Sequence, residues 1–147
     1  MKLSTRTRYG MRALLELALH QGEGPVFLKD IAREQEISLP YLEHLVAPLI
    51  AAGIVRSTKG PRGGISLARD PAGIKLSEIT RVLEGSMAPV ECVNDASVCR
   101  RSVSCVTRDV WTQLKDVMEG VLDATTLQDL VEKHHEKSQS DPAMYNI

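Results

Sequence analysis

A basic loop rich in glycine and proline, between two short apolar stretches, is the feature that most constrains the fold. The stretches are residues 54–57 and 65–68, which read IVRS and ISLA, and the loop between them reads TKGPRGG. Two strand-like runs joined by such a loop predict a β-hairpin. Asp70 and Pro71 then begin a turn.

Helical segments lie on both sides of this hairpin. The apolar spacing predicts helices at residues 5–20, 28–35, 39–52, 76–83, 107–122 and 126–135. The third helix has Ser38 as its expected N-cap and Gly53 just past its end. Its core-facing stripe follows helical spacing through Leu42, Leu45, Val46 and Leu49. Two short helices, a tight turn and a basic hairpin are typical of a winged helix-turn-helix. The expected fold class is therefore mainly α with a small β-hairpin wing.

The charge distribution favours a polyanionic partner. The chain has a net charge of −1, but residues 1–86 carry 12 basic and 9 acidic side chains, whereas residues 87–147 carry 6 and 10. Between Glu43 and Asp70 there is no acidic residue, and this interval contains Arg56, Lys59, Arg62 and Arg69. A local basic field of this kind attracts nucleic acid whatever the net charge of the whole chain.

Residues near the start of the third helix and in the hairpin are the candidate DNA contacts. Recognition helices read base edges with their N-terminal part, and a carboxylate such as that of Glu43 can accept from cytosine N4. Arginine at the hairpin tip can enter a minor groove, and glycines let backbone approach a phosphate closely. The full set is Ser38, Pro40, Tyr41, Glu43, His44, Arg56, Lys59, Gly60, Arg62 and Gly63. Taken singly, these residues would also fit a solvated helix face and an ordinary hairpin.

All three cysteines lie within one polar segment, CVNDASVCRRSVSC, at positions 92, 99 and 105. Thiolates are preferred ligands of soft metals and iron–sulfur clusters. Arg100 and Arg101 would offset an anionic centre and lower the thiol pKa values. We therefore expect Cys92, Cys99 and Cys105 to bind a metal or cluster. The alternatives are a structural zinc site, a thiol switch, and three unrelated buried thiols.

These segments together resemble one family of bacterial transcription regulators, the IscR/NsrR family. The stretches "LSTRTRYGMRALLELAL", "ISLPYLEHL" and "VRSTKGPRGGISLARDP", followed by three cysteines, carry the resemblance over residues 1–134. It implies a homodimer, a long dimerisation helix and an iron–sulfur cluster, [2Fe-2S] or [4Fe-4S], that adjusts binding to a palindromic operator. It leaves open whether the regulator represses or activates.

The fourth cluster ligand departs from the family pattern. The IscR type has a histidine three residues after the third cysteine, where this chain has Arg108. The NsrR type uses an N-terminal aspartate from the partner subunit, and the matching position in this chain is Arg8. Arginine is not a usual metal ligand. Glu91, Asp95 and Asp109 are nearby candidates, and water, a small thiol or a residue of the other subunit are alternatives.

The sequence predicts a winged helix-turn-helix DNA-binding domain at residues 1–86, a cluster-binding loop at 87–106, dimerisation helices at 107–135 and a flexible tail at 136–147. No stretch resembles a signal peptide or a membrane span, so we expect a cytoplasmic protein.

No catalytic arrangement is visible, so no enzyme is expected, and His20, His134 and His135 are expected to be solvated. A cluster-free regulator that senses a metabolite or a thiol is the alternative function. An iron–sulfur electron carrier is less favoured because of the basic hairpin.

Overall fold

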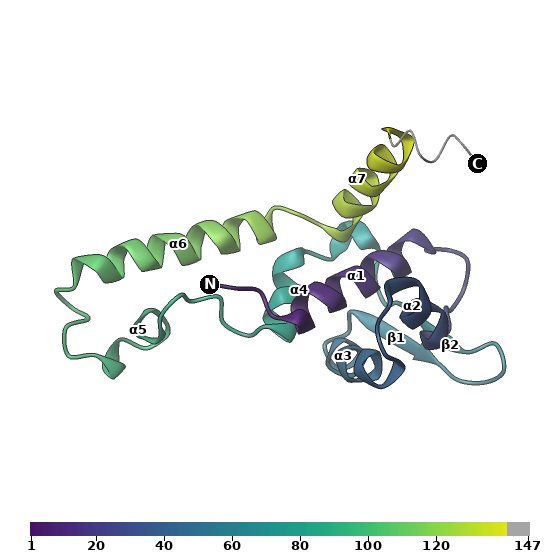
Figure 1. Cartoon of the computed structure of the whole chain (residues 1–147), viewed down its shortest axis with the longest axis horizontal. Coiled ribbons are helices and arrows are strands. Elements are labelled where there is room, and N and C mark those ends of the chain that lie inside the picture. The colour runs from purple at the N-terminus through teal and green to yellow at the C-terminus, as the bar shows by residue number, and fades with distance from the viewer. Residues whose placement is uncertain (141–147) are drawn as a thin grey trace.

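The predicted helices and hairpin are present in the computed structural model, which describes residues 1–140 (Figure 1). The first part of the chain forms a winged-helix head, residues 5–83. Its elements are α1 (Thr5–Leu19), α2 (Leu28–Gln35), α3 (Leu39–Ala51), β1 (Val55–Thr58), β2 (Gly64–Leu67), a short 3-10 turn (Pro71–Gly73) and α4 (Leu76–Leu83). The remainder contains α5 (Glu91–Asn94), a 3-10 turn (Ala96–Val98), α6 (Val106–Asp123) and α7 (Leu127–Ser140).

The ends of the head helices follow from local sequence. The hydroxyls of Ser4 and Ser38 accept from the backbone N–H groups of Thr7 and Tyr41 and cap α1 and α3. Gly53 adopts a φ of +74° just after α3, a conformation that costs glycine little. At α4 the N-cap position is Lys75, and Ser77, in the first turn, donates to Asp123 Oδ1 at 2.9 Å.

The two wing strands pair in antiparallel register, from Val55 opposite Leu67 to Thr58 opposite Gly64. Val26, before α2, adds a bridge by exchanging two 2.8 Å hydrogen bonds with Ile65. The inward side chains Val55, Ile65 and Leu67 are buried, whereas the far end of β1 is exposed. The base of the wing is therefore fixed to the head while its tip projects away from it.

The core of the head is aliphatic, as the scarcity of aromatic residues requires. Fully buried side chains come from all the head helices and include Leu14, Ile31, Leu42, Leu49, Ile54 and Ile79. Leu127 and Val131 of α7 belong to this same core, and α7 contacts α1. The sequence grouped residues 107–135 into one dimerisation unit, but the structure packs α7 onto the head.

Helix α6 has a different environment. Figure 1 shows it extending away from the head, with the α5 segment beside its first turns. None of its residues is buried. Its C-terminal end is fixed to the head by backbone pairing, since Leu76 N–H donates to Thr125 at 2.9 Å and Leu127 N–H to Ile74 at 3.0 Å.

The C-terminal helix is longer than the sequence pattern suggested. The apolar spacing ended at 135 and a flexible tail was expected from 136, but α7 continues to Ser140. The rest of the expected tail, residues 141–147, lies outside the described residues. Within residues 1–140, no helix combines the length and apolar character needed to cross a membrane.

Candidate DNA-binding surface and cysteine segment

The outer face of α3 is accessible at its N-terminal end. Packing of its apolar stripe into the core leaves Ser38, Pro40, Glu43 and His44 exposed on the other side. Tyr41 is half-buried, because its ring packs edge-to-face on Tyr9 with centroids 6.1 Å apart. Four of the five predicted contacts on α3 are thus free to meet a groove, and Tyr41 also anchors the helix to α1.

The wing presents three exposed cations, Arg56, Lys59 and Arg62. None of them forms an ion pair with another residue in the described part of the chain. Arg69, the fourth cation of the acid-free interval, differs because it pairs with Glu78 at 2.6 Å. The basic field of the wing therefore comes from residues 56–62 and remains available to an external anion.

The two glycines predicted as wing contacts have different environments. Gly60 is exposed at the tip, with a φ of +106°. Gly63 is buried, and its N–H donates to the Gly60 carbonyl at 2.9 Å. A side chain at Gly63 would collide with the carbonyl oxygens of Thr58 and Gly60. Gly63 therefore closes the turn of the wing and is not on its outer surface.

The cysteine segment, residues 92–105, lies beside the N-terminus of α6. Cys92 is half-buried in α5, Cys99 is exposed, and Cys105 is the half-buried N-cap residue of α6; all three are free thiols. Within residues 1–140, no three His, Cys, Asp or Glu side chains are close enough together to hold a metal ion. The single chain therefore does not bring the three thiols together, contrary to the expectation of a shared centre.

Cys105 is nevertheless in an environment that favours thiolate. Contact with the Thr107 hydroxyl, 3.2 Å from its sulfur, lowers the pKa of this thiol, and the backbone N–H of Arg108 adds to the effect. Both groups belong to the first turn of α6, where the helix dipole also favours negative charge. Asp109 acts in the opposite direction, since its charge raises the pKa of Cys105.

Arg108, at the position of the family's histidine, has a structural contact. Its Nε donates to the backbone carbonyl of Cys92 at 2.9 Å and so connects α5 to α6. Of the nearby candidate ligands, Glu91 and Asp109 are exposed. Asp95 accepts from the N–H and hydroxyl of Ser97, which lowers its pKa. None of the three carboxylates joins a group of cysteines.

Two polar clusters escaped the sequence analysis because their members are far apart in the chain. Glu84 Oε2 accepts from the backbone N–H and hydroxyl of Ser4, at 3.1 and 2.6 Å, and from the hydroxyl of Thr7. These contacts lower the pKa of Glu84, with the Ser4 hydroxyl as the main cause. This cluster, which we call the Glu84 anchor, joins the start of α1 to the end of α4.

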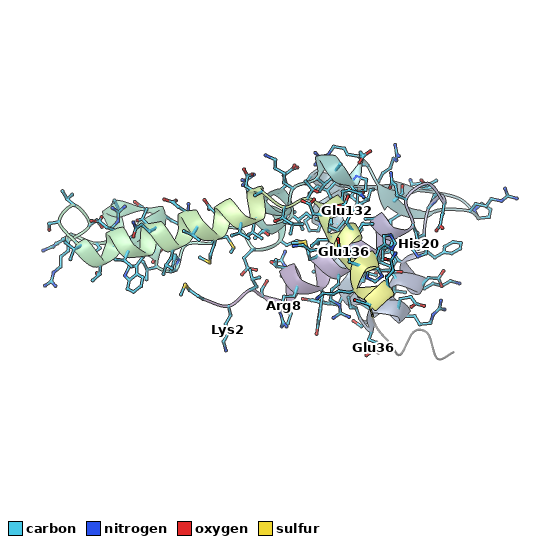
Figure 2. The ribbon with its side chains drawn as sticks, turned by 90° about the horizontal axis from the view of Figure 1, so that it is seen from above. Lys2, Arg8, His20, Glu36, Glu132 and Glu136 are labelled. Atoms are coloured by element: carbon cyan, nitrogen blue, oxygen red, sulfur yellow. The ribbon has the colours of Figure 1, made fainter. Side chains whose placement is uncertain are left out.

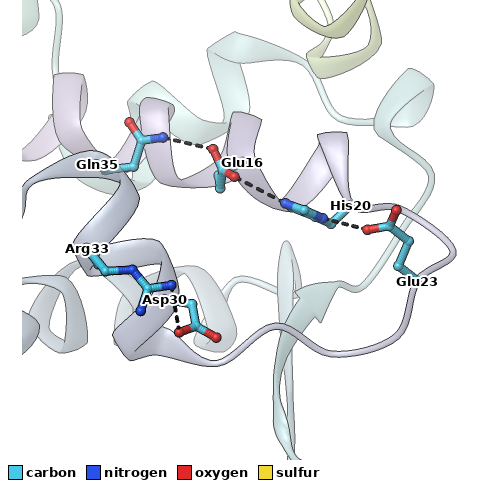
Figure 3. Close-up of polar contacts among 6 residues, drawn as sticks. All are labelled: Glu16, His20, Glu23, Asp30, Arg33 and Gln35. Atoms are coloured by element: carbon cyan, nitrogen blue, oxygen red, sulfur yellow. Dashed lines mark hydrogen bonds and ion pairs between the residues drawn. The ribbon is translucent and has the colours of Figure 1, made fainter. Parts of the chain in front are cut away.

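The second cluster surrounds His20, which was expected to be solvated. Figure 3 shows its ring between two carboxylates, with Nδ1 2.5 Å from Glu23 and Nε2 3.2 Å from Glu16. Gln35 of α2 donates to the other oxygen of Glu16 at 2.9 Å. The hydrogen bond with Glu23 is the main cause that raises the pKa of His20. The cluster connects the end of α1 to α2.

The chain that carries the exposed face of α3 and the unpaired wing is similar to known proteins. The family model of Rrf2, described as an iron-dependent transcriptional regulator, matches residues 3–133. The chain belongs to the Rrf2 family. It is a DNA-binding transcriptional regulator and not an enzyme, and its winged-helix fold is that of its structural neighbours. The predicted resemblance to IscR-type regulators is confirmed.

Relatives within the family differ in what they are named for. The regulator CymR of Bacillus subtilis is 44% identical over 130 residues, which cover 88% of this chain and 89% of CymR. The solved structure of CymR, described as the global cysteine regulator of B. subtilis, has a TM-score of 0.77 at 42% identity and covers 90% of this chain and 98% of its own. The structure of T. potens IscR has a TM-score of 0.80 at 43% identity. The match covers 99% of this chain and 96% of the IscR chain.

Proposed function

We propose that this regulator acts as a homodimer on a palindromic operator and that an iron–sulfur cluster held by Cys92, Cys99 and Cys105 modulates its binding. The proposed sensing role is supported chiefly by the cysteine segment, residues 92–105. Three free thiols lie within fourteen residues of polar chain, immediately before the long helix that leaves the head. The resemblance to IscR supports a cluster as the ligand.

Dimerisation is supported by the surface of α6. Val110, Val117 and Val121 are 50%, 65% and 62% exposed, and the helix buries no residue within its own chain. An apolar stripe of this length on a protruding helix is typical of a surface that a second subunit covers. The occupant that we propose is the same helix of a second copy. A two-fold dimer would place two heads on two half-sites of a palindrome.

The donor set fits a cluster in its chemistry, but the thiols are apart in the single chain. Metal sites seldom exist preformed, and ligand binding commonly orders the segment that provides the ligands. Cys99 is exposed to an incoming iron centre, and Cys105 favours the thiolate form that binds iron. When bound, a cluster would supply an oxidation-sensitive group, and Arg100 and Arg101 would offset its negative charge. Residues 92–105 come immediately before α6, so a group bound there would act on the start of the helix that leaves the head.

The fourth ligand is proposed to be exchangeable or to come from outside residues 92–108. Arg108 cannot ligate, and its hydrogen bond to Cys92 already has a structural purpose. An open coordination position suits a sensor of nitric oxide, oxygen or iron supply. Electron paramagnetic resonance of the anaerobic protein, before and after nitric oxide, tests this point; a cluster unchanged by nitric oxide contradicts it.

The deciding experiment is anaerobic purification with iron and sulfide measured per chain. We expect bound iron and sulfide with a visible absorption spectrum, and loss of both in Cys99→Ala. Helical content and dimer mass should be unchanged in that variant, because the Cys99 side chain is exposed and packs into no core. Ser104→Ala, exposed beside Cys105 and with no role as ligand, is the matched control. If Cys99→Ala unfolds the chain, the segment is structural and not a sensor.

A cluster-free thiol sensor is the second candidate, and it does not require the convergence of all three thiols, which the described part of the single chain does not show. The similarity to CymR, described as a cysteine regulator, points the same way. In this case the anaerobic protein is colourless and iron-free. Its operator affinity then changes with the ratio of reduced to oxidised thiol in the buffer, and Cys99→Ala or Cys105→Ala removes the change. A coloured, iron-containing protein with no such dependence excludes it.

A further inference from the structure

A second basic surface lies outside the recognition helix and the wing, at the start of the chain. Four cations, Lys2, Arg6, Arg8 and Arg12, precede the first acidic residue of the sequence, Glu16. All four are exposed, and none forms an ion pair with another of the described residues. We call them the α1 basic patch. Figure 2 shows Lys2 and Arg8 extending away from the ribbon on the same side of the molecule.

The patch is physically continuous with the reading end of α3. The Tyr9 ring packs on Tyr41, and the Tyr41 hydroxyl is 3.3 Å from the hydroxyl of Thr5. The guanidinium carbons of Arg8 and Arg12 lie 5.9 and 5.3 Å from the centre of the Tyr9 ring. Two arginines thus flank an aromatic pair whose other member is in the first turn of the recognition helix. Whatever DNA approaches Ser38 and Glu43 also approaches these cations.

The side chains of Arg8 and Arg12 differ in the contacts that restrain them. Arg12 donates from Nη2 to the backbone carbonyl of Gln35 at 2.6 Å, so its position also depends on the end of α2. Arg8 contacts only the face of the Tyr9 ring in the described part of the chain, and its donors are free. Glu84 accepts hydrogen bonds from Ser4 and Thr7, and its charge also interacts with Arg6. Glu36 lies farther along the same side in Figure 2 and limits the patch there.

We infer that the α1 basic patch, with Arg8 at its centre, binds backbone phosphates of the same duplex that α3 reads. The inference rests on the DNA-binding function stated above and extends the surface beyond the helix and wing. Phosphate contacts fix the position and orientation of the protein without reading sequence. Stacking on Tyr9 holds the guanidinium while its donors face outward, which suits the bidentate geometry of a phosphate. Arg8 therefore sets affinity and register, and α3 sets specificity.

The test is a salt titration of duplex binding by fluorescence anisotropy, with an operator duplex and a duplex of scrambled sequence. Arg8→Ala removes one phosphate contact per subunit, so the slope of log affinity against log salt should fall by about 1.8 for a dimer. The loss should be equal on both duplexes. Arg8→Lys should recover most of the slope because it restores the charge. Lys133→Ala, an exposed cation on α7, is the matched control and should leave the slope unchanged.

Each of the other possible results contradicts either the inference about Arg8 or the DNA-binding function. A wild-type slope for Arg8→Ala contradicts the inference and leaves the DNA-binding function intact. If Arg8→Ala is monomeric in sedimentation while the wild type is dimeric, Arg8 contacts the partner subunit and the inference is wrong. A wild-type protein that binds neither duplex refutes the DNA-binding function and the inference together.

Discussion

Removing the Glu84 anchor should destabilise the head by an amount that the structure allows us to work out. The perturbation is Glu84→Ala. A hydrogen bond to a charged group contributes about 1.5–3 kcal/mol. Glu84 Oε2 accepts three, but its carboxylate is only half-buried, so solvent reduces the contribution of each. Thr7, which is 2% exposed, keeps a weak 3.4 Å contact with Ser4.

We therefore expect Glu84→Ala to lower the free energy of unfolding by about 2–3 kcal/mol. At this chain length that is a fall of about 5–10 °C in Tm. Urea unfolding at fixed protein concentration measures it, with an unchanged m-value as the sign that only stability has changed. Glu132→Ala, which removes an exposed carboxylate on α7 with no ion pair among the described residues, is the control and should stay within about 0.5 kcal/mol of the wild type.

The pH dependence provides an independent test of the same anchor. Because folding lowers the pKa of Glu84 below its ordinary 4.5, its stabilisation is complete above that pH. The stability difference between wild type and Glu84→Ala should therefore shrink as pH falls below 4.5, and vanish below the lowered pKa. A difference that stays constant across this range, or a variant as stable as the wild type at pH 7, would refute the reasoning.

Three more outcomes follow from the described contacts. Arg62→Ala should weaken binding about tenfold in an anisotropy titration and reduce its salt slope, because an unpaired wing cation is lost; Arg69→Ala, already paired, should change neither. Val117→Glu should give a folded monomer in sedimentation, since Val117 is 65% exposed in the single chain; a dimer would exclude this face as the interface. The raised pKa of His20 means that its charged pairs stabilise the fold at low pH and are lost as pH rises through that pKa. His20→Gln should therefore have a lower free energy of unfolding than the wild type at pH 5.5, measured with urea, and the same free energy of unfolding at pH 9.

Local patterns in the sequence were enough to predict the elements of the head. The predicted α2 and α4 have the boundaries that the structure shows, and the other predicted helices and strands differ by at most one residue at either end, apart from the C-terminal end of α7, which is longer. Ser38 and Gly53 occupy the cap positions expected of them. These features depend on neighbours within about four residues, which a single sequence contains.

The candidate site was predicted in part. The exposed face of α3 and the free wing cations follow from helical periodicity and from the absence of acids between Glu43 and Asp70. The burial of Gly63 and the ion pair of Arg69 with Glu78 could not be predicted in this way. Both depend on the three-dimensional path of the wing and of the 3-10 turn after it. The four-residue helix α5 was missed, since so short a segment has no apolar period.

The sequence by itself determined the helices, the wing and the DNA-binding class, because caps, turns and apolar spacing act locally along the chain. Only the tertiary structure decided which distant groups meet. It paired Glu84 with Ser4 and Thr7, packed α7 on the head, left α6 uncovered, and kept the three thiols apart within one chain. Contacts between residues many positions apart depend on the packing of whole elements, and no local pattern encodes them.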